Sequence, residues 1–337
     1  MASIDYACET TPEPGKTFDV APGVRWLRMP LPLALDHVNL WLLADGAHWA
    51  AVDTGLATGE IRQHWQTLLG EHSLSQLIVT HLHPDHLGNA GWLQRTTGAT
   101  LAMTLGEYTS AHLLLAEVGH WAFSATESFF ARHGLGDDML AALRARGSAF
   151  KRGVPEIPLS YRRLLDGDVL RIGANEWRVI VGYGHSPEHA SLYCAELGVL
   201  ISGDMMLPRI STNVPVQPHS PDTDALALFL ASIARFRELP ADTLVLPSHG
   251  KPFRGLHARI AQLEQHHAER CAILLNACKT PQTAAELIPI LFDRPINDAH
   301  QIFFALGEAI AHLNHLEHAG RLVRREEGPI TRYVVPD

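Results

Sequence analysis

The chain has 337 residues, of which 46% are hydrophobic and 19% are charged. This length and this apolar fraction suit about two folded domains, and they exclude an extended disordered protein. No apolar run approaches the roughly 18 residues that a membrane-spanning helix needs. Lys and Arg total 27 against 36 Asp and Glu, so the formal net charge of −9 disfavours binding to nucleic acid or to anionic lipid.

The start of the chain and its cysteines indicate a reducing compartment. Residues 1–14 are polar and mildly acidic and do not resemble a secretory signal, so we expect a cytoplasmic protein. The four cysteines suit neither a disulfide framework nor a thiolate zinc site, because even Cys271 and Cys278 lie seven positions apart. The 21 histidines are more informative, since imidazole is the commonest protein metal ligand.

The first third of the chain alternates strands with helices. Short strands are predicted over 24–28, 38–43 and 49–52, and the turn at Asp45-Gly46 makes them an antiparallel meander. An amphipathic helix follows over 59–69. The apolar strand 76–80 then leads into a histidine-rich segment, after which a helix resumes near Asn89.

The rest of the chain predicts a helical insertion, a second set of strands and a helical end. The insertion, 106–160, contains helices over 107–118, 124–133 and 137–146. Strands return over 169–172, 177–182, 191–194, 199–202 and 243–247, with a helix near 223–238. After Phe253 the chain is helical to Asn276 and breaks at Thr280-Pro281. Helices over 283–292 and 298–318 and a hairpin over 321–325 and 331–335 then suit a small winged-helix module.

The segment Thr80–Gly88 carries four metal-binding side chains within six residues: His81, His83, Asp85 and His86. Side chains two apart at an extended strand end point to one side, so His81 and His83 can bind one metal. Pro84 turns the chain and directs Asp85 and His86 toward a second metal. The spacing therefore predicts two adjacent metals.

Three further candidates follow apolar runs in the second half of the chain: His185, Asp204 and His249. Each is flanked by Gly or Pro, as expected for loop residues that converge at one edge of a sheet. A lone histidine of this kind is more often structural than a ligand. Four ligands in one Gly/Pro-punctuated loop after a buried strand reverse those odds.

The run His81-x-His83-x-Asp85-His86 resembles the signature of the metallo-β-lactamase superfamily. The resemblance covers about residues 21–256, because Asp53, His185, Asp204 and His249 stand in that family's order and local contexts. It implies an α/β fold, a four-layer αββα sandwich with a dinuclear site at one edge. The implied first metal ligands are His81, His83 and His185; the implied second metal ligands are Asp85, His86 and His249, with Asp204 bridging and Asp53 bracing the ligand loop.

These boundaries predict three parts: an N-terminal tail over 1–20, the metallo-β-lactamase-like domain over 21–256 with its insertion, and a C-terminal helical, winged-helix-like domain over 257–337. The C-terminal part resembles the tail of a lactamase-like branch whose members include enzymes that cut single-stranded RNA. Residues 281–337 contain five Arg and no Lys against eight Asp or Glu, the wrong sign for binding phosphates. We interpret this part as a packing or homodimerisation surface.

Nitrogen and oxygen ligands without cysteine favour two Zn²⁺, with iron or manganese as alternatives. Metal binding lowers the pKa of water to about 7, so we expect a metal-bridging hydroxide, hydrogen-bonded to the catalytic Asp85, to attack a carbonyl. A thiolate leaves readily because its conjugate acid has a pKa of about 8.5, so a small acyl thioester is the favoured substrate, ahead of esters and lactones. The sequence is similar to the glyoxalase II branch rather than to penicillin-destroying or flavodiiron enzymes.

Two alternative functions remain open at this point. One is a metal-dependent endoribonuclease or phosphodiesterase of the lactamase-like type. The other is a non-catalytic binding descendant of the fold, which should have lost ligands, whereas all seven positions are filled.

Weaker predictions concern the surroundings of the metals. The insertion either covers the metal edge as a lid or extends the outer layer of the sandwich. As a lid it would bring Tyr108, Trp121 and Tyr161 to an apolar acyl pocket, with Arg209 meeting an anionic substrate group. His189, four residues after His185, is predicted to support a ligand without binding metal.

Overall fold

The computed structural model describes residues 3–32, 35–292, 295–296 and 298–336. Contacts within the chain divide it into two compact units. The first comprises Met1–Leu115, Phe150–Thr212 and Ser232–Ile260, and the second comprises Ala116–Ala149, Asn213–Ala231 and Ala261–Asp337. None of the helices in the described part of the chain combines the length and the apolarity that crossing a membrane requires.

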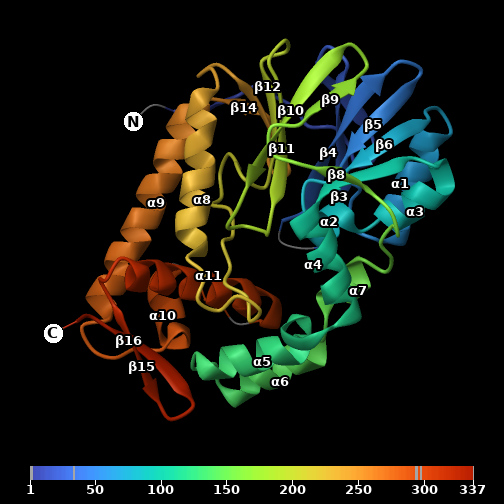
Figure 1. The fold of residues 1–337 in the computed structure, drawn as a ribbon. Helices are drawn as coiled ribbons and strands as arrows, with labels where there is room; N and C mark the ends of the chain where they lie inside the picture. The colour runs from blue at the N-terminus through green and yellow to red at the C-terminus, as the bar shows by residue number, and fades with distance from the viewer. Residues whose placement is uncertain (1–2, 33–34, 293–294, 297, 337) are drawn as a thin grey trace. The chain divides into compact units, whose positions relative to one another are not determined.

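The N-terminal sheet of the first unit has seven strands, in the order β2-β3-β4-β5-β6-β7-β8 (Figure 1). They are β2 (Thr17–Ala21), β3 (Val24–Pro30), β4 (His37–Asp45), β5 (His48–Val52), β6 (Leu74–Ile78), β7 (Thr100–Thr104) and β8 (Arg162–Leu164). Pairing is antiparallel from β2 to β5 and parallel from β5 to β8. The predicted antiparallel meander is therefore confirmed.

The second sheet of this unit also has seven strands, in the order β1-β14-β13-β12-β11-β10-β9. They are β1 (Asp5–Tyr6), β9 (Val169–Ile172), β10 (Asn175–Gly182), β11 (His189–Cys194), β12 (Val199–Gly203), β13 (Leu244–Pro247) and β14 (Phe253–Arg254). All neighbours are antiparallel except β12 and β13, which run parallel.

Apolar side chains from both sheets form one continuous core between them. Trp26 and Trp41 of the first sheet and Trp177 of the second belong to this core and are at most 1% exposed. Burial of such large side chains contributes about 2 to 3 kcal/mol each. The two facing sheets are the inner layers of the predicted sandwich.

A second apolar cluster covers the other face of the N-terminal sheet. Helices α1 (Gly59–Leu69) and α3 (Ala90–Thr97) lie beside this sheet (Figure 1). They supply Ile61, Trp65 and Leu93 to the cluster. Thr58 caps α1 by accepting a hydrogen bond from the Ile61 N–H, which satisfies one of the unpaired amides at the helix start. Helix α1 has the predicted bounds, because its apolar positions repeat at helical spacing.

The second unit is mainly helical and carries a small sheet. Its elements are η1 (Gly119–Trp121), α5 (Phe123–Arg132), α6 (Asp137–Arg146), α10 (Ala284–Leu291), α11 (Ala299–His318) and the hairpin β15 (Val323–Glu327) and β16 (Ile330–Val334). Four further helices cross or adjoin the unit boundaries: α4 (Leu105–Ala116), α7 (Ala149–Gly153), α8 (Ala225–Ala234) and α9 (Leu256–Ala277). Residues Arg235–Glu238 form the short η2 of the first unit. The helix, helix, hairpin order of the C-terminal part is confirmed.

The predicted domain boundaries differ from the observed units at the N-terminal segment, in the insertion and at residues 213–231, which were predicted in the metallo-β-lactamase-like domain but belong to the second unit. The segment 1–20 is no simple tail, because β1 pairs with β14 and β2 pairs with β3. The insertion is divided, since residues 116–149 join the C-terminal residues in the second unit. Strands β7 and β8 were not predicted, because the five-residue β7 lacks a strict alternation of apolar and polar side chains and β8 is the charged run Arg162-Arg163-Leu164.

Candidate metal centre

Every predicted ligand lies where a strand of the first unit ends. His81 and His83 follow β6, and His185 follows β10. Asp204 directly follows β12, and His249 follows the neighbouring parallel strand β13. The short helix α2 (Pro84–Leu87) begins at Pro84 and holds Asp85 and His86. Strand ends from both sheets therefore bring the seven side chains to one edge.

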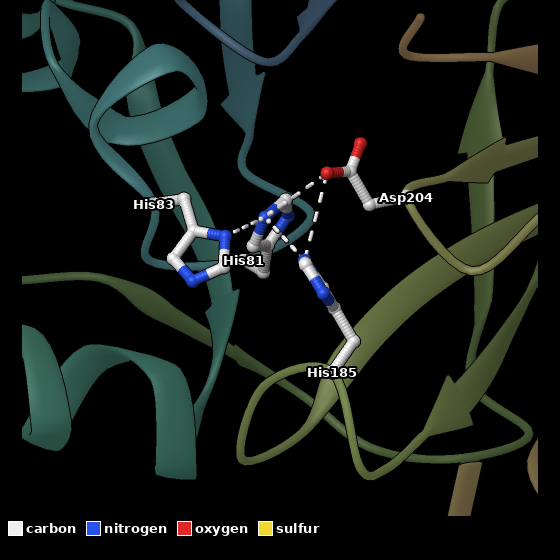
Figure 2. A group of neighbouring side chains, drawn as sticks. All are labelled: His81, His83, His185 and Asp204. Carbon is white, nitrogen blue, oxygen red and sulfur yellow. Dashed lines mark hydrogen bonds and ion pairs between the residues drawn. The ribbon is translucent and has the colours of Figure 1, made fainter. Parts of the chain in front are cut away.

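The first group of ligands consists of His81, His83, His185 and Asp204, whose ligand atoms all lie within 4.8 Å of one another. His81 Nε2 is 2.9 Å from His83 Nδ1 and 3.2 Å from His185 Nε2. Asp204 Oδ2 is 3.5 Å from His185 Nε2. Figure 2 shows the four side chains converging from the loop after β6 and from the second sheet.

The second group consists of Asp85, His86 and His249. Asp85 Oδ2 lies 3.5 Å from both His86 Nε2 and His249 Nε2. Asp204 contributes here as well, because its Oδ1 is 3.6 Å from His86 Nε2 and 3.5 Å from His249 Nε2. The two oxygens of Asp204 therefore face different groups, as the predicted bridging position requires.

The distances of 3.5 to 3.6 Å between histidine nitrogens and the carboxylates of Asp85 and Asp204 fit metal ions. Ligands bound at about 2.1 Å in tetrahedral geometry lie roughly 3.4 Å from one another, longer than an ordinary hydrogen bond. Within the described residues, His86 Nε2 and Asp204 Oδ1 are buried and have no hydrogen-bond partner. Buried polar atoms are almost always satisfied, so these two indicate a place for a cation.

Asp53 fixes His86 from behind. Its Oδ2 lies 2.8 Å from His86 Nδ1, and its Oδ1 accepts the Thr80 N–H at 2.8 Å. The Thr80 hydroxyl lies between this carboxylate and His81 Nδ1, 3.0 Å away, so Asp53 also influences His81. Because the far nitrogens donate protons to these acceptors, the Nε2 atoms are left free as ligands. Asp53 adopts a φ of 66°, which aspartate tolerates better than most residues.

His249 is fixed from the N-terminal sheet. Its Nδ1 lies 2.8 Å from the His37 carbonyl oxygen, which leaves Nε2 free. Asn39 of β4 donates to the carbonyls of Pro247 and Gly250 at 2.8 and 2.7 Å and so clamps the loop on both sides of His249. Asn39 was not predicted, although a buried asparagine inside the apolar run 38–43 was a usable signal.

His189 bonds the backbone of Asp204. Its Nε2 accepts the Asp204 N–H at 3.1 Å, and its side chain is fully buried. Gly203 makes this contact possible, because a Cβ there would lie 2.3 Å from His189 Nε2. Gly203 also has a φ of +54°, the left-handed region that glycine favours.

Burial and charge act differently on the two groups. Burial, together with the neighbouring His185, lowers the pKa of His83 to about 3, and burial holds the pKa of His81 well below its usual value. Burial also opposes protonation of His86, but the carboxylates of Asp85, Asp53 and Asp204 outweigh it and raise that pKa. The first group thus presents neutral imidazoles, the form that binds metal. The second group attracts positive charge.

The four predicted substrate residues are not brought together as one cluster. Tyr108 stacks on Tyr161 with ring centroids 3.8 Å apart, and its hydroxyl donates to the Pro158 carbonyl. Both rings pack against the outer core of the N-terminal sheet. Trp121 belongs to the second unit, where it stacks on His219, and Arg209 is exposed. Their part in substrate binding stays a prediction.

The family model of the metallo-β-lactamase superfamily matches residues 33–249. The chain belongs to this superfamily. A second family model, the C-terminal domain of metallo-β-lactamase-like proteins, matches residues 271–336. The two sheets and their helices are thus the metallo-β-lactamase fold that the sequence predicted.

Relatives of known structure cover almost the whole chain. A β-lactamase domain protein from Burkholderia ambifaria is 48% identical, has a TM-score of 0.92 and covers 99% of this chain and 98% of its own. A metallo-β-lactamase family protein from Thermus thermophilus is 30% identical, with a TM-score of 0.81, over 94% of this chain and all of its own.

Two curated relatives are named as hydrolases. The probable metallo-hydrolase YqjP of Bacillus subtilis is 24% identical over 90% of this chain and 94% of its own. A hydroxyacylglutathione hydrolase of Ectopseudomonas mendocina is 23% identical over 73% of this chain and 74% of its own. The chain is a metallo-hydrolase of the superfamily, with histidines and aspartates able to hold metal.

Proposed function

We propose that the protein is a hydrolase of small acyl thioesters that uses two divalent cations, with zinc preferred. His81, His83 and His185 would hold the first cation, Asp85, His86 and His249 the second, and Asp204 would bridge them. The observation that carries this proposal is the carboxylate of Asp204, whose two oxygens lie 3.5 to 3.6 Å from ligand atoms of two different groups.

Bound in these groups, the cations would supply Lewis acidity and lower the pKa of water to about 7. The protein residues then orient the reactants. Asp85 and His83 are the half-exposed ligands, whereas His81 and His86 are fully buried, so substrate approaches from the side of Asp85. We assign Asp85 the role of orienting the attacking water and accepting its proton, because its carboxylate is 23% exposed while still facing the second group.

Two considerations favour a thioester. Thiols have a pKa of about 8.5, so a thiolate needs little help from a protein acid in order to leave. The named substrate of one relative, hydroxyacylglutathione, is itself a thioester. Esters and lactones need more help at the leaving group and are the next candidates.

The charges of the C-terminal hairpin argue against RNA as the substrate. Arg324 pairs with Asp222 and Glu317 at 2.6 and 2.7 Å. Arg332 pairs with Glu286 and Glu327, both at 2.9 Å. These guanidinium groups are already neutralised, so they offer little to a phosphate backbone. We propose instead that this part serves packing or homodimerisation, in a protein of the cytoplasm.

A panel of short acyl thioesters, esters, lactones and single-stranded RNA tests the proposal. We expect the zinc-loaded protein to hydrolyse thioesters fastest, to lose the activity with a chelator and to regain it with zinc. Asp85→Asn, assayed with excess zinc so that both groups are filled, should lower kcat by at least about 100-fold. Exposed Asp19→Asn is the matched control. Cleavage of RNA alone, or inert protein holding two metals, would contradict the proposal.

A further inference from the structure

A buried glutamate that no ligand role explains connects the two loops of the first metal group. Glu107, in the first turn of α4, has no solvent exposure. Its Oε2 accepts the N–H of Leu82, the residue between His81 and His83, at 2.9 Å. Its Oε1 accepts a hydrogen bond from the Ser186 hydroxyl at 2.6 Å and from the Glu188 N–H at 2.7 Å. Both residues lie in the loop that contains His185.

Glu188 in turn accepts hydrogen bonds from residues next to Glu107. The Glu188 carboxylate accepts the N–H of Gly106, the residue before Glu107, at 2.8 Å. The Glu188 carbonyl accepts the Thr104 hydroxyl at 2.7 Å. A Cβ at Gly106 would lie 2.9 Å from the Glu188 side chain, so glycine permits this close approach. Each glutamate thus binds the backbone beside the other.

An apolar residue at 107 would not serve the same purpose. It would leave the buried Leu82 N–H without an acceptor, at about 1 to 3 kcal/mol, and would also deprive the half-buried Glu188 N–H and Ser186 hydroxyl of theirs. The carboxylate itself is expensive to bury: burial raises the pKa of Glu107 to about 7, even though its three donors oppose the change. The chain therefore keeps a costly group whose contacts all lie beside His81, His83 and His185.

The contacts are selective for the first group. In the described residues, none of the hydrogen bonds of Glu107 or Glu188 reaches Asp85, His86 or His249. The second group has its own support, since Asp53 holds His86 Nδ1 and His37 holds His249 Nδ1. Glu107 and Glu188 thus support one group, whereas Asp53 bonds His86 directly and reaches His81 only through the Thr80 hydroxyl.

We propose that Glu107 and Glu188 form a reciprocal carboxylate clamp that sets the spacing between the His81–His83 loop and the His185 loop, and so determines the affinity of the first metal group alone. Both are positioning residues rather than ligands. The inference rests on the proposed function, because it presumes that the two groups bind metal.

The test measures cobalt binding by competition with a chromophoric chelator. Glu107→Gln keeps the side-chain volume but turns one acceptor into an NH₂ group that faces an N–H donor. We expect about 10- to 100-fold weaker binding of one of two cobalt ions, with the other unchanged. Glu188→Gln, at a half-buried position, should weaken the same ion less, and it serves as the second variant if Glu107→Gln does not fold. Exposed Glu71→Gln is the matched control.

Asp53→Asn separates this effect from general loosening. An asparagine oxygen can still accept from Thr80, but its NH₂ would meet His86 Nδ1 and move the His86 proton to Nε2. We therefore expect Asp53→Asn to weaken the other ion, and the Glu107→Gln, Asp53→Asn double variant to weaken both. Wild-type affinities in Glu107→Gln, or equal loss at both ions, would overturn the clamp. Wild-type protein that binds no cobalt would overturn the proposed function itself.

Discussion

At the scale of single residues, the metal centre depends on which nitrogen of each histidine carries its proton. His86 and His249 each use Nδ1 for a bond to a fixed acceptor, the Asp53 carboxylate and the His37 carbonyl. The opposite nitrogen is then free and faces Asp204. A metal site made this way needs little rearrangement on binding, because its ligand atoms are oriented before the ion arrives.

Asp204 should affect both metals, whereas His249 should affect one. Asp204→Ala removes the oxygen that faces each group, so we expect both metals to be lost on dialysis. His249→Ala removes a ligand of the second group alone and should leave about one metal per chain. Elemental analysis of the dialysed proteins measures the difference. Two retained metals in Asp204→Ala would mean that this carboxylate does not bridge.

Glu308, in the second unit, makes stability depend on pH. Burial raises its pKa to about 7 in the folded protein, although the amide of Asn213 opposes the change. The unfolded carboxyl titrates near its usual 4.5, so the folded state binds the extra proton between these values, and stability falls as pH rises through about 7.

Glu308→Gln removes this titration and keeps an oxygen for Asn213. As pH rises from about 5 to about 8, the free energy of unfolding of the variant should increase relative to that of the wild type, by up to about 3 kcal/mol. Urea unfolding at several pH values gives the difference, and exposed Glu269→Gln corrects for the change in net charge. An advantage that does not grow with pH would show that Glu308 stays ionised.

At the scale of secondary-structure elements, the sequence predicted most of what positions the site. Strands β6, β10, β12 and β13 carry apolar runs that stop at Gly, Pro or Thr, so both their existence and the ligand after each could be predicted. Glu107 could not be found this way. A glutamate at the start of a helix is usual on an exposed surface, and only the fold brings Leu82 and Ser186 to it.

The two glycines at the ends of strand β12 differ in how much space surrounds them. Gly198 precedes this strand and Gly203 ends it, and both have a positive φ, +61° and +54°. A Cβ at Gly198 meets nothing within 4 Å, whereas one at Gly203 would lie 2.3 Å from His189 Nε2. Gly198→Ala should therefore lower the free energy of unfolding only by the cost of a left-handed backbone at alanine, about 1 to 2 kcal/mol.

Gly203→Ala adds a steric conflict with a buried ring, so we expect at least about 2 kcal/mol of further destabilisation. It should also displace Asp204 and weaken metal binding, which Gly198→Ala should leave unchanged. Urea unfolding and a metal-binding titration of both variants measure this pair of effects. Equal behaviour of the two variants would mean that His189 moves aside without consequence for Asp204.

At the scale of the whole molecule, the candidate metal ligands all come from one of the two units. All seven ligands belong to the first unit, although the segments that form this unit are interrupted by residues 116–149 and 213–231 of the second. The sequence predicted the ligands but not this division, because helices of similar composition join either unit. Which unit each helix joins depends on its long-range packing with the C-terminal helices, and local sequence patterns do not predict that packing.

Binding of metal should therefore stabilise the first unit directly. A ligand that binds only the folded state adds about 2.7 kcal/mol at a concentration about one hundred times its dissociation constant. Hydrogen exchange with and without zinc should show slower exchange in peptides over 78–90, 182–190 and 201–207, which contain the ligand loops. Peptides over 299–334 should change little, because they contribute no ligand. Equal protection throughout the chain would mean that the two units unfold as one cooperative structure.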